Sequence, residues 1–373
     1  MTVRRRTGPA GRGWLRVDLG LIIAASGLSL IGVLLIWSAT RADDGTSVAL
    51  KQLVSVGIGM MAAFGVTRLD VRTLRALAPT LYVLATLGLL AVLSPLGSTV
   101  NGSRSWIRLP GGFSLQPSEL AKVGLVIALA MILADRGDRG SPQRHRDVVL
   151  AWLLAAVPIG LVLLQPDLGS ALVLVAMAVV IIASSGAPWP WTAAVVGAGV
   201  AGLVAAFTTP LLSGYQRTRL LAFLDPDLDP QGIGYQTRQV RIAIGSGGLD
   251  GQGLFQGMQT QGGFIPFQET DFIFSVAGEE LGFVGSVGLI ILVGFLVVRA
   301  GIVAGRADAF GRFVALGVAL WFGVQAFENI GMNLGLMPVT GLPLPFVSYG
   351  GSSMIASWIA VGLVAKVSSG SSR

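Results

Sequence analysis

The chain lacks cysteine, has a single histidine and carries few charged residues. Its 373 residues include no Cys, one His and only 12% Asp, Glu, Lys and Arg, against about 25% in soluble domains. Without cysteine the chain can form neither a disulfide framework nor a thiolate metal site. The one histidine, His145, lies in a basic loop, which argues against a histidine-based catalytic dyad and a His/Cys zinc centre. Acid–base chemistry would therefore have to use carboxylates, lysine or tyrosine.

Apolar residues dominate instead. They make up 53% of the chain, and the mean hydropathy of +0.74 is typical of a polytopic membrane protein. A spanning helix needs roughly 20 apolar residues. Segments of this kind predict ten transmembrane helices, over 17–39, 49–67, 74–94, 117–134, 148–165, 168–185, 189–212, 270–298, 309–333 and 348–367. No linker divides them, so we expect one all-α domain over 1–373. The net charge of +7 indicates membrane orientation rather than nucleic-acid binding.

An even number of spans places both termini on one side of the membrane, and the basic residues indicate which side. Of the 26 Lys and Arg residues, 17 fall in segments on the N-terminal side, including the basic tail 1–16, and 8 fall on the other side. Because basic residues collect on the cytoplasmic side, we expect both termini in the cytoplasm and a multi-pass location in the membrane.

Two predicted outer loops are long, over 95–116 and 213–269. Long loops in compact proteins are usually either functional or disordered. The second contains too many aromatic and aliphatic residues for a disordered segment. We expect it to fold over the outer face of the membrane, with a short interfacial helix around 234–244.

Asp271 stands at the start of the predicted span 270–298. A carboxylate inside a bilayer costs about 2.5–3.5 kcal/mol on insertion scales, so such a residue often has a function. An aspartate in the first turn of a helix also stabilises the positive end of the helix dipole. The position alone leaves two interpretations open, a helix cap and a chemical role.

A second polar pair opens the predicted span 117–134. Glu119 lies in its first turn, after Pro117, and Lys122 follows one turn deeper on the same face. This span runs in the same direction as 270–298, so we expect Glu119, Lys122 and Asp271 to share one depth near the outer headgroups. Either Glu119 and Lys122 form an intrahelical salt bridge that offsets the cost of their burial, or all three residues lie in one polar cavity.

Arginines gather in the predicted outer loops, on the side where arginine is normally scarce. They are Arg104, Arg108, Arg217, Arg219, Arg238 and Arg241. Long translocated loops tolerate such residues. Alternatively, the guanidinium groups bind the phosphates of an anionic substrate, to which arginine offers bidentate hydrogen bonds.

Other polar groups have simpler structural explanations. Asp167 is placed to cap the span 168–185. Glu279 and Glu280 are expected to form hydrogen bonds within the bundle, with a proton path as the alternative. A polar stripe on the span 309–333 is expected to form interhelical hydrogen bonds. Its members are Gln325, Glu328, Asn329 and Asn333.

Seven motifs extend over nearly the whole chain. They are Asn101-Gly102-Ser103-Arg104-Ser105-Trp106-Ile107, Gln116-Pro117-Ser118-Glu119-Leu120-Ala121-Lys122, Gln165-Pro166-Asp167-Leu168-Gly169, Gly234-Tyr235-Gln236, Ile242-Ala243-Ile244-Gly245-Ser246-Gly247-Gly248-Leu249, Thr270-Asp271-Phe272-Ile273-Phe274 with Glu279-Glu280-Leu281-Gly282, and Gly341-Leu342-Pro343-Leu344-Pro345-Phe346-Val347-Ser348-Tyr349-Gly350-Gly351-Ser352-Ser353. Together they resemble the SEDS family (shape, elongation, division and sporulation). The chain departs from the family at Glu269, where a histidine is usual.

This resemblance implies a ten-helix peptidoglycan glycosyltransferase that polymerises lipid II and works with a class B penicillin-binding protein. Asp271 matches the family's essential aspartate, and Glu119 and Lys122 match residues of its cavity. The substrate-binding residues expected from the motifs and the outer arginines are Arg104, Trp106, Gln116, Ser118, Arg217, Arg219 and Ser348. Within the family, the segments 243–246 and 257–259 resemble the branch that acts in cell elongation more than the branch that acts in division.

The expected chemistry is an inverting glycosyl transfer. The donor sugar of lipid II is α-linked to pyrophosphate and the product is β-1,4, so a single displacement suffices. We expect Asp271 to act as general base for the acceptor GlcNAc 4-hydroxyl, with Glu119 as the other candidate. Lys122, the outer arginines and a divalent cation (Mg²⁺ or Mn²⁺) held by Asp271 and Glu119 would stabilise the departing undecaprenyl pyrophosphate.

Two other functions stay open at this point, a lipid II flippase and a non-catalytic scaffold. A transporter of this size is expected to show paired repeats, broken helices and a site near the membrane midplane. None of these is evident in the sequence. A scaffold would not need three ionisable residues in a common layer.

Overall fold

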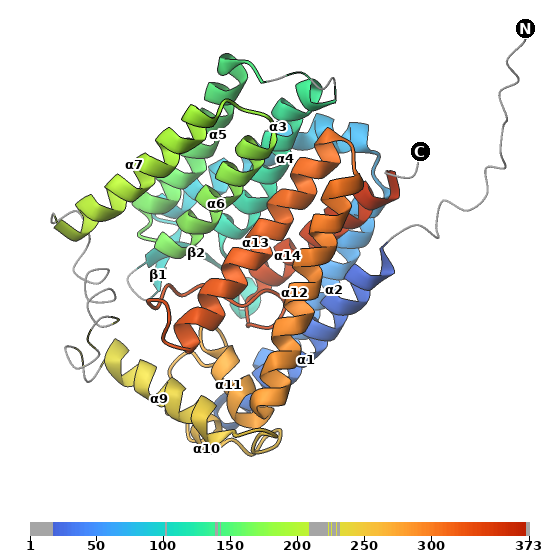
Figure 1. The fold of residues 1–373 in the computed structure, drawn as a ribbon. Helices are drawn as coiled ribbons and strands as arrows, with labels where there is room; N and C mark the ends of the chain where they lie inside the picture. Colours follow the sequence, from blue (N-terminus) through green and yellow to red (C-terminus); the bar gives the residue numbers. More distant parts are fainter. Residues whose placement is uncertain are drawn as a thin grey trace, which may run out of the picture.

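The structure is a computed structural model that describes residues 18–100, 103–138, 141, 143–208, 223, 225, 229 and 232–370, without the side chains of 43, 100, 200–208 and 370. The helices are α1 Leu19–Asp44, α2 Ser47–Arg68, α3 Val71–Leu93, α4 Pro117–Gly137, α5 His145–Leu164, α6 Leu168–Ser184, α7 Trp189–Thr208, α9 Ile233–Ser246, α10 Met258–Gln261, α11 Ile273–Glu280, α12 Gly282–Arg306, α13 Ala309–Asn333 and α14 Gly351–Gly370. Figure 1 shows the long helices packed side by side in a bundle. The predicted class, an all-α polytopic membrane protein, is confirmed.

The long helices follow the hydropathy of the sequence. Among the described residues, eight helices are long and apolar enough to cross a membrane, namely α1 to α5 and α12 to α14. A ninth apolar helix, α6, has 17 residues, and α7 is described only in part. Apart from the predicted span 270–298, the bounds agree with the predicted spans within a few residues, while the total of ten spans stays a prediction.

Three of the described helices are the most enclosed in the bundle. The apolar windows of α4, α14 and α13 are 83%, 72% and 67% buried inside the protein, against 22% for α3 and 28% for α5, which leave more surface for lipid. The helix α13 packs against α4, α6, α12 and α14. Because α4 and α13 are enclosed by other helices, any polar group on their facing sides is removed from lipid.

The predicted span 270–298 is not one continuous helix, and this corrects the interpretation of the sequence. The chain runs as α11 to Glu280, breaks at Leu281, and continues as α12 from Gly282. Gly282 has φ of 67°, in the left-handed region that favours glycine. Only α12 is long enough to cross a membrane.

Hydrogen bonds to the preceding loop explain the break. Two bonds run from the loop segment 248–253 to the last carbonyls of α11, and two run back from the first turn of α12. They join Gln252 N to Glu279 O (2.9 Å), Gly253 N to Glu280 O (3.1 Å), Phe283 N to Gly248 O (2.9 Å) and Val284 N to Leu249 O (3.1 Å). The peptide groups freed by the break are therefore satisfied by protein rather than exposed to lipid.

A small antiparallel sheet precedes α4 and was not predicted. Its strands are β1 Gly97–Val100, β2 Ser103–Leu109 and β3 Phe113–Leu115, in the order β1-β2-β3. A 3₁₀ turn at Pro110–Gly112 joins β2 to β3. The sheet leads directly into the first turn of α4, so it fixes where Glu119 enters the bundle.

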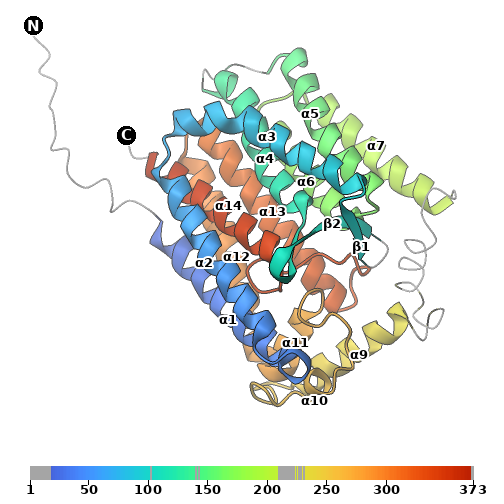
Figure 2. The same cartoon turned by 180° about the vertical axis from the view of Figure 1, so that it is seen from behind.

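The short helices of the described chain lie at one end of the bundle. Figures 1 and 2 both place α9, α10 and α11 together there, and α9 confirms the predicted short helix around 234–244. At the other end, Asp18 before α1 binds Arg299 near the end of α12 at 2.5 Å. Lys366 near the end of α14 donates to the carbonyl of Thr67, near the end of α2, at 3.4 Å. The two described ends of the chain therefore lie on the same side, opposite α9–α11.

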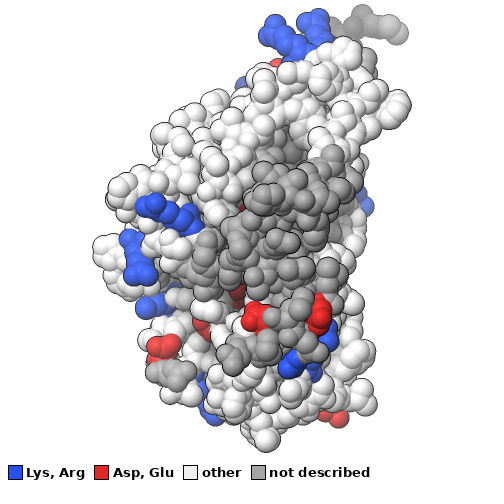
Figure 3. All heavy atoms as spheres, turned by 90° about the vertical axis from the view of Figure 1, so that its left-hand side faces the viewer, with Lys and Arg blue, Asp and Glu red and all other residues white. Residues whose placement is uncertain are grey.

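The surface agrees with a lipid-facing bundle. On the face seen in Figure 3, charged side chains form separate groups at the upper tip and over the lower part, and the described surface of the upper body shows few of them. Many large apolar residues are exposed along the spans, as Leu53 and Leu153 illustrate. Such exposure suits contact with lipid chains.

Candidate active site

An ion pair is buried in the first turns of α4. Pro117 occupies the start of the helix and Glu119 lies in its first turn. Lys122 Nζ lies 2.7 Å from Glu119 Oε1, and both side chains are 0% exposed. The structure thus contains the intrahelical salt bridge that was one of the two arrangements expected for this pair. A charge pair removed this far from water is strongly destabilising to split, because the remaining ion has no solvent.

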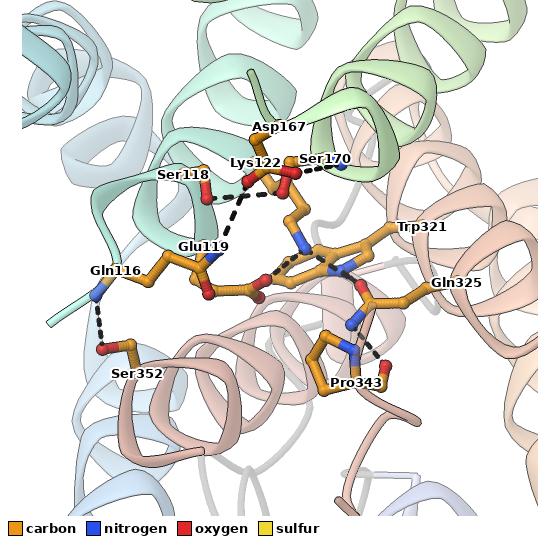
Figure 4. Close-up of polar contacts among 10 residues, drawn as sticks. All are labelled: Gln116, Ser118, Glu119, Lys122, Asp167, Ser170, Trp321, Gln325, Pro343 and Ser352. Carbon is orange, nitrogen blue, oxygen red and sulfur yellow. Dashed lines mark hydrogen bonds and ion pairs between the residues drawn. The ribbon is translucent and has the colours of Figure 1, made fainter. Parts of the chain in front are cut away.

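Residues of α13 complete the surroundings of Lys122. Its ammonium donates to Gln325 Oε1 at 2.9 Å and lies 5.0 Å from the centre of the Trp321 ring. Trp321 Nε1 donates to the same Gln325 oxygen at 2.6 Å. The amide nitrogen of Gln325 donates to the carbonyl of Pro343 at 2.8 Å. Figure 4 shows the lysine between the glutamate, the indole and the amide.

Glu119 keeps one unused oxygen. Its Oε2 is buried and has no hydrogen-bond partner in the described structure. A carboxylate oxygen left in this state is costly unless a proton, a water or a ligand satisfies it. The pair is therefore not a closed unit.

Polar residues at the entrance to α4 tie it to α6 and α14. The Gln116 side chain donates to Asp167 Oδ2 at 3.3 Å, and its backbone N–H donates to Ser352 Oγ at 3.0 Å. Ser170 Oγ donates to Ser118 Oγ at 3.4 Å. Asp167 also accepts the N–H of Ser170 at 3.0 Å, which confirms its predicted role as the cap of α6. Figure 4 shows these residues around the start of α4.

Asp271 lies outside a helix, contrary to the predicted first-turn position. The N-cap of α11 is Phe272, and no acidic residue lies in the first turn. The Asp271 side chain is half-buried. Its backbone carbonyl accepts hydrogen bonds from Asn329 Nδ2 at 3.0 Å and Asn333 Nδ2 at 3.1 Å. Asp271 is therefore held by its main chain.

The polar stripe of α13 connects the two regions. Gln325 contacts Lys122, whereas Asn329 and Asn333, one and two turns further along, contact Asp271. This confirms the predicted interhelical hydrogen bonding. The segment 343–352 makes a second connection, since Ser348 Oγ donates to the carbonyl of Thr270 at 2.6 Å while Ser352 reaches α4. The common cavity of Glu119, Lys122 and Asp271 stays a prediction.

Glu328 is a buried acid to which the sequence interpretation assigned no chemical role. It lies on α13 between the residues that contact Lys122 and Asp271, and it is 2% exposed. It accepts a hydrogen bond from Thr340 Oγ1 at 3.3 Å. Its position one turn after Gln325 is a sequence signal that Glu328 and Gln325 lie on the same side of α13, because residues three apart share a helix face.

The structure describes two further substrate-binding residues predicted in the outer loops, Arg104 and Trp106. Arg104 donates to the carbonyls of Ser94 at 2.7 Å and Gly97 at 3.3 Å. It therefore joins the end of α3 to the sheet. Trp106 lies on β2 opposite Ser98. Arg217 and Arg219 lie outside the described residues.

The adjacent acids Glu279 and Glu280 fix the loop after α9. Glu279 accepts hydrogen bonds from the N–H groups of Gln259 and Thr260 at 2.7 and 2.9 Å, and from the Thr260 hydroxyl at 2.7 Å. Glu280 accepts from Ser38 Oγ of α1 at 2.6 Å. The expected hydrogen bonding within the bundle is confirmed for Glu280, whereas Glu279 binds α10 instead.

Glu269 lies two residues before Asp271, in the loop. Burial raises its pKa above the ordinary glutamate value, a backbone hydrogen bond lowers it in part, and Asp44 raises it further. The pKa of Tyr349 is also raised, first by burial and then by the charges of Glu269 and Asp44. The residue in place of the family's usual histidine thus keeps its proton to a higher pH than an ordinary glutamate does.

The described residues offer little for the predicted divalent cation. They contain no group of three His, Cys, Asp or Glu side chains arranged to hold a metal. One oxygen of Glu119 is bound to Lys122, whose positive charge opposes a second cation. Asp271 and the free Glu119 oxygen fall short of the six ligands that Mg²⁺ requires, so most would have to come from substrate and water.

The fold and this site define a multi-pass membrane protein in which one helix, α13, contacts both a buried ion pair and the main chain of an aspartate. Residues 15–373 match the family model of FtsW, RodA and SpoVE, described as cell cycle protein. The chain belongs to this family, as its resemblance to SEDS proteins predicted.

Individual relatives agree over nearly the whole chain. The chain is 38% identical to the probable peptidoglycan glycosyltransferase FtsW of Trichlorobacter lovleyi, over 95% of this chain and 93% of that protein. It is 36% identical to the peptidoglycan glycosyltransferase MrdB of Escherichia coli, over 95% and 94%. A solved structure described as coordinating polymerization and crosslinking in a peptidoglycan synthase complex is 38% identical with a TM-score of 0.80, over 96% of this chain and 100% of that one.

These likenesses identify an enzyme of the glycosyltransferase class. They do not separate the elongation branch, represented by RodA, from the division branch, represented by FtsW. Identities of 38% to an FtsW and 36% to MrdB are too similar to choose between them.

Proposed function

We propose that this chain polymerises lipid II into β-1,4 glycan strands at the outer leaflet of the bacterial plasma membrane. Membership of a family of peptidoglycan glycosyltransferases supports the class of reaction. The observation that carries the proposal is that α13 binds both polar regions: Asn329 holds the half-buried Asp271, and Gln325, one turn earlier, contacts Lys122 of the buried pair. Asp271 lies near the end of the bundle that carries α9–α11. This position suits lipid II, whose headgroup stays in water while its tail stays in lipid.

Asp271 acts as the general base in this proposal. It takes the proton of the acceptor GlcNAc 4-hydroxyl as that oxygen attacks C1 of the donor MurNAc. The C1–O bond to undecaprenyl pyrophosphate breaks with its electrons on the leaving oxygen, and the configuration at C1 inverts. The half-exposed carboxylate can reach a substrate hydroxyl, which the fully enclosed Glu119 cannot do without rearrangement. This favours Asp271 over Glu119 as base.

Lys122 stabilises the departing pyrophosphate through the electric field of its charge, which Glu119, Gln325 and the Trp321 ring hold in place. Because the Lys122 side chain is as fully buried as that of Glu119, direct contact with the phosphates requires the site to open. Glu119 holds the ammonium in place. The remaining sequence-predicted contacts, including Gln116, Ser118 and Ser348, organise the backbone of this region in the described structure. A cation would add Lewis-acid stabilisation to the same leaving group.

A class B penicillin-binding protein is the proposed partner, and elongation the proposed setting. The similar solved structure is of a peptidoglycan synthase complex, which supports a partner that crosslinks the strands. The segments 243–246 and 257–259 support the elongation branch. Both termini are proposed to lie in the cytoplasm, because the described chain ends share the side opposite α9–α11.

The test compares two activities of the same preparation. The full-length chain, co-expressed with a class B penicillin-binding protein, is placed in liposomes and assayed for glycan strands from lipid II and for headgroup translocation. We expect polymerisation without translocation. Translocation without polymerisation would instead establish a flippase, and neither activity would favour a scaffold.

A further inference from the structure

The stretch Glu269–Asp271 is bound along its main chain by residues distant in sequence. Three successive carbonyls accept hydrogen bonds. That of Glu269 accepts from Tyr349 N at 2.8 Å, and that of Thr270 accepts from Ser348 Oγ at 2.6 Å. The Asp271 carbonyl accepts from two asparagines of α13. Backbone outside a regular helix rarely has every consecutive carbonyl fixed by tertiary contacts, because most such segments face solvent.

The two asparagines use all their amide hydrogens. Asn329 Nδ2 donates to the carbonyls of Asp271 at 3.0 Å and Leu342 at 2.7 Å. Asn333 Nδ2 donates to Asp271 at 3.1 Å and to the carbonyl of Asn329 at 2.8 Å. Both side chains are 0% exposed. An amide nitrogen carries two donors, so neither has one left for a ligand.

Asn333 also caps the helix that follows the aspartate. Its Oδ1 accepts the N–H of Ser275 at 3.1 Å. The helix α11 lacks a side-chain cap from its own N-cap residue, Phe272. One asparagine on α13 thus fixes the chain both at Asp271 and at the first turn of α11, where the Ser275 N–H also donates to the carbonyl of Phe272 at 2.9 Å.

We propose that Asn329 and Asn333 are positioning residues for the general base, a role that rests on the proposed function of Asp271. They set the direction in which the Asp271 side chain leaves the main chain, while touching no reacting atom themselves. The stripe on α13 also carries Gln325 against Lys122. The helix α13 therefore sets the spacing between Asp271, the proposed base, and Lys122, the ammonium group that stabilises the leaving group.

The position of Asp271 matters because proton transfer requires a narrow distance range. A displacement of about 1 Å at a reacting group can lower a rate by about 10²-fold. Loss of the asparagine donors leaves the carboxylate chemically intact but free to shift. The expected signature is a lower kcat with an unchanged KM for lipid II, since the contacts that bind the substrate are untouched.

Asn329→Leu is the sharpest variant, because Asn329 Oδ1 has no hydrogen-bond partner among the described residues and only two donated bonds are removed. Asn329→Ser is a milder second variant in case the leucine chain does not fold. Gln143→Leu is the matched control. Gln143 is a buried amide that donates to the carbonyls of Leu133 at 2.9 Å and Ser185 at 3.3 Å near the other end of α4, and its oxygen is likewise unpartnered.

The assay is lipid II polymerisation by the full-length chain co-expressed with a class B penicillin-binding protein, with folded protein quantified by size exclusion. We expect kcat to fall by about 10²-fold in Asn329→Leu with KM within about twofold, and to fall less in Asn329→Ser. Gln143→Leu should lose thermal stability but keep its kcat. A wild-type kcat in folded Asn329 variants, or an equal loss in Gln143→Leu, would overturn the positioning role. Asp271→Asn runs beside them: if it retained the wild-type rate, the proposed function itself would fail.

Discussion

The Glu119–Lys122 pair and the Asp271 stretch are fixed in opposite ways. The pair forms within one helix turn, at 2.7 Å, with both side chains fully buried. Asp271 is half-buried, outside any helix, and its main chain is held by residues 58 and 62 positions away. The first arrangement keeps a charge in place for binding or stabilisation. The second leaves a carboxylate accessible while restricting where it can move, which is what a general base needs.

Breaking the buried pair should have the largest effect on the fold. Lys122→Ala leaves the Glu119 carboxylate buried without a counter-ion, which we expect to destabilise the protein by about 3–5 kcal/mol. Removing both charges, in Glu119→Gln with Lys122→Met, should restore most of that stability. Thermal unfolding in detergent measures both.

The double variant separates structure from chemistry. It is expected to be folded yet slow in lipid II polymerisation, because the lysine that serves the leaving group is gone. If the double variant polymerised at the wild-type rate, the pair would be only a structural feature of α4.

Disturbing the break between α11 and α12 should have the next largest effect on stability. This break follows α11, the helix that begins just after Asp271. A side chain at Gly282 would place its Cβ 2.3 Å from Gly251 N and 2.6 Å from Leu249 O, in a backbone conformation of positive φ. Gly282→Ala is therefore expected to cost at least about 1–3 kcal/mol. The measurement is thermal unfolding, with limited proteolysis of the segment 247–261.

Gly288→Ala is the control for this variant. It lies in the same helix and its Cβ would meet nothing within 4 Å. The two variants should differ clearly, with Gly288→Ala close to the wild type. Equal stability would show that the packing of segment 248–253 against the break is unimportant.

The smallest effect is expected at Glu269, and it depends on pH. Burial raises the pKa of Glu269, so the folded chain holds a proton that the unfolded chain releases. Its contribution to stability is present below the unfolded value of about 4.3 and is lost as pH rises through the raised pKa. Glu269→Gln should therefore match the wild type near pH 4 and exceed it in melting temperature at higher pH.

Asp44→Asn tests the cause of this shift. Asp44 raises the pKa of Glu269 less than burial does, so the variant should gain stability in the same direction by a smaller amount. A difference in melting temperature between wild type and Glu269→Gln that stayed constant with pH would contradict the raised pKa.

The difference between the two regions also explains what the sequence could reveal. Helix bounds follow from runs of apolar residues, and the ion pair follows from a spacing of three, because both are local patterns. The break at Leu281 could not be found, since its cause is pairing with a loop about thirty residues earlier. Asn333 was recognised only as part of a polar stripe. Its two roles depend on the tertiary approach of α13 to the start of α11, which no local pattern encodes.

The most direct measurement is the rate of lipid II polymerisation by Asp271→Asn in folded, full-length protein with its penicillin-binding partner. Asparagine keeps the size of the side chain and the carbonyl bonds to α13, and it removes only the basic oxygen. We predict a loss of about 10²–10⁴-fold in kcat, the usual contribution of a general base. A rate equal to that of the wild type would contradict the assignment of Asp271 as the base.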